Sequence, residues 1–114
     1  MDRHGRQSRL AEVGASGQER IGRADAAVPL GGLAGEVAAR YLAGAGVRRL
    51  RVNGDAAARA ARAVDPSVRV EVDATLGDVS GASPFGLRDR AADDVARGAH
   101  AALVALRRAL GMVP

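Results

Sequence analysis

The sequence contains no cysteine, no lysine and no tryptophan, and it has only one phenylalanine and one tyrosine in 114 residues. Without cysteine, the chain forms no disulfide or cysteine-ligated zinc site and carries out no thioester or persulfide step. Without lysine, it has neither a P-loop lysine nor a Schiff-base nucleophile. These absences exclude several large enzyme classes before any motif is considered.

Long hydrophobic runs are also missing. No segment approaches the roughly 18 consecutive apolar residues of a membrane span. The first nine residues are polar and lack the apolar core of a signal peptide. We therefore expect one cytoplasmic domain over residues 1–114 with no membrane contact, in which residues 1–7 form a disordered tail.

The charge is positive but dispersed. Seventeen arginines against 13 acidic residues give a net charge of +4. The arginines are scattered and almost no aromatic residues accompany them, whereas nucleic-acid binding favours basic clusters beside stacking rings. We expect no nucleic-acid partner. Because alanine supplies much of the apolar content, the core buries little area per residue, and we expect a partner subunit to support it.

The hydrophobic pattern predicts a β-α-β-α-β order. The expected strands cover residues 24–30, 47–53 and 68–72, the expected helices 35–44 and 56–64, a loop 73–87 and a long helix 88–110. The predicted fold is α/β: a small Rossmann-like three-stranded parallel sheet in the order 3-2-1, with flanking helices and a long C-terminal amphipathic helix. The apolar stripe expected on that helix comprises Val95, Ala99, Ala102, Leu103, Leu106 and Leu110.

A glycine turn follows the first predicted strand. In the frame of the nucleotide-binding fingerprint it reads Pro29-x-Gly31-x-x-Ala34, so only the middle glycine is in place. Proline at the first position removes an N–H group. The Gly31 and Gly32 amides still suit an anion at a helix start. Two hypotheses remain open here: a phosphate-binding turn, and a purely structural strand-to-helix turn.

Polar side chains after the second predicted strand form the next candidate site. An acid about 20 residues past the glycines binds ribose hydroxyls in Rossmann folds. Asn53 stands near that position without a charge, and Asp55 follows two residues later. Because aspartate is strongly favoured at helix N-caps, we expect Asp55 to cap the next helix. His4 and His100 have no second ligand at metal spacing, so we expect no metal site and no catalytic histidine.

Taken together, these segments resemble the ThiF/MoeB/HesA family of ubiquitin-activating-enzyme-like adenylyltransferases. The family's conserved order is R-Y-x-R-Q, G-x-x-G-Q, G-A-G-G-L-G, Y-L-A-A-A-G-V and D-x-D. The matching segments are Arg6-Gln7-Ser8-Arg9, Gly14 with Gly17-Gln18, Gly31-Gly32-Leu33, Tyr41-Leu42-Ala43-Gly44-Ala45-Gly46-Val47 and Asn53-Gly54-Asp55. Residues 62–71 and the closing helix 101–111 resemble the family's later segments. The similarity covers about two thirds of the chain, in the same order.

The resemblance implies an activity: ATP, with magnesium, adenylates the C-terminal glycine of a ubiquitin-like carrier protein within a dimer. It also assigns a nucleotide site. Arg9 matches the arginine that reaches a partner subunit's nucleotide, Gly31 and Gly32 match the phosphate turn, Asn53 matches the ribose-binding acid, and Asp55 matches the second acid.

The departures from the family concern its chemistry. The arginine-bearing segment after the second acid is replaced by Ala56-Ala57-Ala58, and the catalytic lysine and cysteines are absent. The strand that carries the magnesium-binding aspartate has no counterpart. We therefore expect no catalytic residues. The preferred hypothesis is a non-catalytic binding or scaffold protein, a pseudoenzyme that pairs with itself or with a full-length relative.

Two other hypotheses remain. One is a subunit of an ATP-dependent adenylyltransferase that activates a ubiquitin-like sulfur carrier or a peptide C-terminus. The other is a simple nucleotide-binding module with ATP as its candidate ligand.

Overall fold

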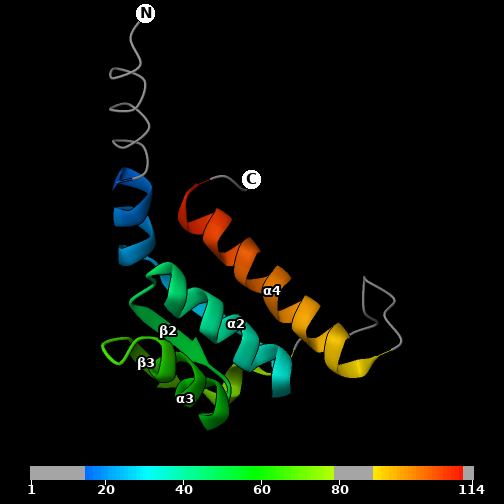
Figure 1. Cartoon of the computed structure of the whole chain (residues 1–114). Helices are drawn as coiled ribbons and strands as arrows, with labels where there is room; N and C mark the ends of the chain where they lie inside the picture. The colour runs from blue at the N-terminus through cyan, green and yellow to red at the C-terminus, as the bar shows by residue number, and fades with distance from the viewer. Residues whose placement is uncertain (1–14, 79–88, 112–114) are drawn as a thin grey trace, which may run out of the picture.

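The computed structural model describes residues 15–78 and 89–111. Its first helix covers residues 15–23. The elements that follow are β1 (Asp25–Val28), α2 (Gly32–Ala45), β2 (Arg49–Val52), α3 (Asp55–Val64), β3 (Arg69–Val72), the 3₁₀ turn η1 (Ala74–Leu76) and α4 (Arg90–Ala109). In Figure 1, α2 lies in the middle of the molecule. The sheet and α3 lie on one side of α2, and α4 lies on its other side.

The three strands form one parallel sheet in the order β1-β2-β3. Asp25 pairs in register with Arg49, which in turn pairs with Arg69. The predicted α/β class, the three-stranded parallel sheet and the long C-terminal helix are therefore confirmed.

Within the described part of the chain, only one face of the sheet is covered. Along β1 and β2 the side chains alternate between exposed and buried. The buried positions pack beneath α2 and α3, where Leu42, Val47 and Val52 are the largest fully buried side chains. Ten of the 18 buried apolar residues are alanines. Small side chains bury little area each, so the helices must approach one another closely to exclude water.

Gly98 permits the close approach of α4 to α2. A Cβ atom at this position would overlap the backbone oxygen of Ala34 and lie 2.8 Å from the Cβ of Val37. Ala102, one turn later on α4, is also buried. The contact between the two helices therefore depends on residues with almost no side chain.

The stripe predicted for α4 is partly wrong. Val95 and Leu103 are 42% and 45% exposed, while the buried residues are Gly98 and Ala102. The smallest side chains face α2 because only they allow the helices to come so close. None of the helices in residues 15–78 and 89–111 combines the length and the apolar character that a membrane span requires.

The buried side of α2 also consists mainly of small residues. Tyr41 is 56% exposed, because Leu42 and the neighbouring alanines form that side. Gly17 lies within the first helix and does not break it. Gly14 and the tail over residues 1–7 lie outside the described residues.

The helix over residues 15–23 joins the C-terminal ends of α2 and α4. Gln18 donates a hydrogen bond from Nε2 to the carbonyl oxygen of Ala45, at 2.9 Å. Arg20 donates from its guanidinium to the carbonyl oxygen of Leu110, at 3.1 Å. Carbonyls in the last turn of a helix have no partner within the helix, and a positive charge there also favours the helix dipole.

The Gly98→Ala substitution tests the α2–α4 contact. We expect a loss of about 2 kcal/mol in the free energy of unfolding, because the added methyl group meets backbone that cannot move aside. Urea denaturation followed by circular dichroism measures this loss.

Gly44→Ala is the matched control. Gly44 is exposed on α2, where a Cβ would make only an ordinary contact with Val64, at 3.7 Å. Alanine favours the helix over glycine by about 1 kcal/mol, so this variant should be at least as stable as the parent. Equal destabilisation of both variants would contradict the proposed close contact.

Candidate functional site

The carboxyl ends of the three strands lie at one edge of the sheet. Since the strands are parallel, the turns that follow β1, β2 and β3 all occur at this edge. The structure therefore brings together the predicted residues Gly31, Gly32, Asn53 and Asp55. Crevices at this edge are the usual ligand sites of open α/β sheets.

The glycine turn opens α2. Gly31 is the N-cap residue, and no side chain caps the helix. Gly32 has a positive φ of 58°, a conformation that glycine adopts without strain.

The glycine required for close packing is Gly35. A Cβ there would overlap the backbone oxygen of Leu30, so the start of α2 lies directly against the chain leaving β1. The frame Pro29-x-Gly31-x-x-Ala34 places the last fingerprint position at Ala34, one residue before Gly35. The pair Gly32-x-x-Gly35 has the spacing of the last two fingerprint glycines and was the signal in the sequence.

Asp78 was not predicted at this edge. Its carboxylate lies beside Gly31: a Cβ on that glycine would be 3.1 Å from Oδ2 of Asp78. Asn53 donates a hydrogen bond from Nδ2 to the carbonyl oxygen of Gly77, at 2.7 Å. This bond fixes the residue before Asp78. The negative charge at the start of α2 therefore comes from the chain itself, where the helix dipole favours an anion.

The prediction that Asp55 caps α3 is wrong. Gly54 is the N-cap residue of α3, no side chain caps the helix, and Asp55 is its first helical residue. A carboxylate in the first turn still interacts favourably with the helix dipole. The sequence could not separate these two positions because aspartate is common at both.

Asp73 closes the turn after β3. Its carboxylate accepts hydrogen bonds from the hydroxyl and from the backbone N–H of Thr75. These two bonds, the hydroxyl first, lower the pKa of Asp73, and the positive charge of Arg51 adds to the shift. Asp65 accepts the same pair of bonds from Ser67, which lowers its pKa in the same way.

The remaining predicted residues contribute little at this edge. Arg9 and His4 lie outside the described residues. His100 is exposed on α4, which packs against α2. Within residues 15–78 and 89–111, no group of three His, Cys, Asp or Glu side chains is placed to hold a metal ion.

The uncovered side of the sheet is the second notable surface. We define the open face as the six outward positions of the strands: Asp25, Ala27, Arg49, Arg51, Arg69 and Glu71. A shallow hollow of about 510 Å³ lies over it. The alternation of arginine with leucine and valine in β2 indicates one polar side of that strand, but not that the whole sheet shares it.

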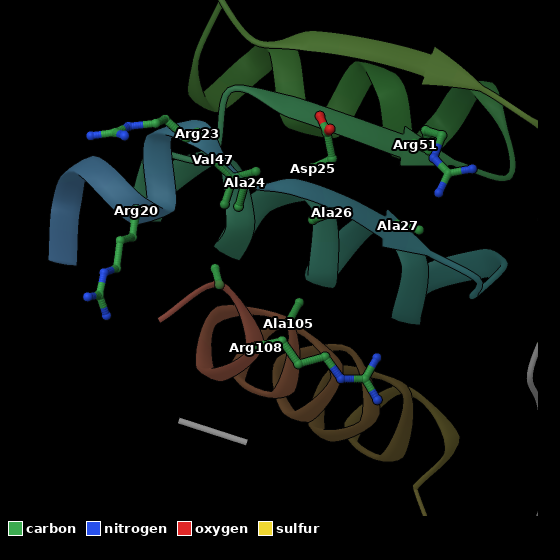
Figure 2. A pocket seen from close by; sticks show the side chains of 11 residues that line it. Arg20, Arg23, Ala24, Asp25, Ala26, Ala27, Val47, Arg51, Ala105 and Arg108 are labelled. Carbon is green, nitrogen blue, oxygen red and sulfur yellow. The ribbon is translucent and has the colours of Figure 1, made fainter. Parts of the chain in front are cut away.

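An adjoining hollow of about 580 Å³ lies where β1, α4 and the helix over residues 15–23 meet. Arg20 and Arg23 extend from that helix at one end, and Arg51 and Arg108 lie toward the other (Figure 2). Alanines from β1 and α4 line it between them. The two hollows share Asp25, Ala26 and Arg51, so they form one continuous surface.

Comparisons of the chain with protein-family models, curated proteins and solved structures found no match. The resemblance to the ThiF/MoeB/HesA family therefore stays a prediction, and the arguments about function rest on the geometry above.

The turn after β3 predicts a pH-dependent contribution to stability. The folded pKa of Asp73 lies below its ordinary value of 3.8, so this contribution is complete above that pH and is lost as the pH falls through the folded pKa. In Thr75→Val, which removes the hydroxyl bond, the pKa of Asp73 should rise toward 3.8. Carboxyl ¹³C NMR titration measures it.

Ser67→Ala is the control for this titration. It should raise the pKa of Asp65 and leave that of Asp73 unchanged, because each carboxylate has its own hydroxyl partner. If Thr75→Val does not move the pKa of Asp73, the hydroxyl bond is not the main cause of the shift.

Proposed function

We propose that this chain is a cytoplasmic, non-catalytic binding module with a Rossmann-like fold, derived from a ThiF/MoeB/HesA-like adenylyltransferase. It acts by pairing with another protein chain, either a second copy or a related subunit. The main support is the position of Asp78, whose carboxylate lies at the start of α2, where such a fold would bind phosphate.

The charges at the carboxyl edge disfavour adenylation. Transfer of a nucleotidyl group needs positive charge around the phosphates. The turns at this edge carry Asp55, Asp73 and Asp78, and Asn53 is engaged with Gly77. The positive charge of Arg51 lowers the pKa of Asp73, but Arg51 lies on the open face rather than in the glycine turn. A phosphate at Gly31 and Gly32 would meet Asp78 first.

A nucleotide-binding module is the second candidate function. The spacing of Gly32 and Gly35 favours it, because Gly35 gives α2 the close seating on β1 that nucleotide-binding turns use. In that case Gly31, Gly32, Asn53, Asp55 and Arg9 would be the nucleotide-contacting residues. An adenylyltransferase subunit with a carrier-protein partner would use the same positions and borrow its missing groups from another subunit.

Nucleotide titration separates these functions. We expect that millimolar ATP, ADP or AMP, with magnesium, gives no rise in the melting temperature of the full chain. The Asp78→Asn variant should gain a measurable rise with ATP, because it removes the charge that competes with phosphate.

Asp25→Asn is the control, since it removes the same charge from the open face and should gain nothing. Stabilisation of the unmodified chain by a nucleotide would favour the binding-module alternative. ATP-dependent pyrophosphate exchange with a carrier protein would favour the enzyme.

A further inference from the structure

The open face has the properties of a docking surface for one particular kind of partner. We propose that it binds a helix of another protein that presents a row of glutamate or aspartate side chains. This inference rests on the proposed function and specifies the partner that such a binding module would take.

The first argument is that no element among residues 15–78 and 89–111 covers the second face of the sheet. Parallel sheets occur almost only with both faces covered, and their strands are then apolar throughout. Here α2 and α3 cover one face, while β2 and β3 alternate apolar and charged residues. The layer missing from such an α/β arrangement is a layer of helices.

The second argument is the charge of the open face. Arg49 and Arg69 are paired in register, and Arg51 lies two residues from Arg49 on the same side of β2. None of the three has a side-chain hydrogen bond or ion pair with any residue in the described part of the chain. Like charges on neighbouring strands repel one another. Asp25 lies in register beside Arg49 and Glu71 beside Arg51, but neither carboxylate forms an ion pair with these arginines in the described part of the chain. A partner's carboxylate placed over the three arginines would relieve the repulsion between them and form charge-assisted hydrogen bonds.

The adjoining hollow extends this positive surface. Together the two hollows are lined by six arginines and two carboxylates, namely Arg20, Arg23, Arg49, Arg51, Arg69 and Arg108 with Asp25 and Glu71. Two of the arginines already have partners: Arg20 binds the Leu110 carbonyl, and Arg23 pairs with Glu19. Between the charges lie alanines, including Ala27 and Ala105, which leave room for the apolar side of a helix (Figure 2).

The spacing of the arginines suits a helix. Residues two apart on one side of a strand are separated by roughly 6.6 Å. Residues four apart on a helix rise by about 6 Å. A helix lying along β2 with acidic residues at positions i and i+4 therefore places one carboxylate near Arg49 and the next near Arg51.

A second copy of the chain fits this face poorly. Suppose that two copies of the chain pair through their open faces about a two-fold axis. Because β2 is the middle strand of the sheet, β2 of one copy then lies opposite β2 of the other. Arg49 and Arg51 would then meet the same two arginines of the other copy. The segments outside the described residues do not supply the charge either: residues 1–14 hold three arginines and two acidic residues, and residues 79–88 hold one arginine and no acidic residue.

Nucleic acid is also disfavoured. Binding of single strands to a sheet surface uses aromatic side chains on which bases stack, and the open face has none. Asp25 and Glu71 stand at opposite corners of the face, where they would repel a phosphate backbone. A protein helix can carry basic residues opposite Asp25 and Glu71 as well as acidic residues opposite the arginines.

The test uses the full chain and three synthetic helical peptides. Each peptide carries glutamates at i, i+4 and i+7, with alanine, valine or leucine beside them, and each is paired with a version in which glutamine replaces glutamate. Fluorescence anisotropy measures binding. We expect at least one glutamate peptide to bind, more weakly at higher salt, and its glutamine version to bind at least tenfold more weakly.

The triple variant Arg49→Gln/Arg51→Gln/Arg69→Gln should lose at least tenfold in affinity. The matched control is Arg40→Gln/Arg59→Gln/Arg90→Gln, which removes the same charge from exposed positions on α2, α3 and α4. It should retain binding within about twofold. In ¹⁵N NMR spectra of the full chain, the peptide should shift amide signals of β1, β2 and β3 more than those of α3.

Three outcomes would overturn the proposal. The first is an equal loss of affinity in both triple variants, which would indicate attraction by net charge alone. The second is that no glutamate peptide binds more tightly than its glutamine version, and the third is tighter binding of an oligonucleotide that depends on Arg49, Arg51 and Arg69. None of them bears on nucleotide binding at Gly31, so failure of the proposed function and failure of this inference remain distinguishable.

Discussion

The close packing of α2 against the backbone leaving β1 and against α4 determines the rest of this fold. Gly35 lets the helix start against the backbone leaving β1, Gly98 lets α4 pack against its other side, and alanines fill its contact with α3. A chain with so few bulky residues excludes water only by bringing backbones together. The same seating sets the position of the glycine turn, and therefore the place where Asp78 meets the start of the helix.

The elements were predictable to the extent that local pattern determines them. The β-α-β-α-β order followed from alternating valines and leucines, and from glycine, aspartate and proline at the turns. The failures occurred where a contact between distant segments decides the outcome. The side of α4 that packs was decided by backbone approach at Gly98 rather than by its largest apolar residues, and the packing glycine of α2 was Gly35 because of the path of Leu30.

The candidate site, too, was predictable where local pattern determines it and not where contacts between distant segments do. Gly31, Gly32, Asn53 and Asp55 meet at one edge because parallel strands end together, which the sequence pattern predicts. Asp78 lies 25 residues after Asn53, at the end of a turn without hydrophobic periodicity, so no local signal placed it there. The open face was visible in part, since Arg49 and Arg51 alternate with apolar residues. The joining of that face to the hollow lined by Arg20 and Arg108 is a property of the tertiary structure alone.

The hydrogen bond from Arg20 to Leu110 has a consequence for how the chain folds. It joins residues 90 positions apart, and Gln18 meets Ala45 across 27 positions. Contacts so far apart in sequence form late, because the intervening chain must first be ordered. During synthesis, the β1-α2-β2-α3-β3 unit is complete before α4 leaves the ribosome, and until then Ala34 and Val37, which face Gly98 in the folded protein, lie on an uncovered side of α2. The interval before α4 docks is therefore the period in which this protein is most exposed to aggregation and proteolysis.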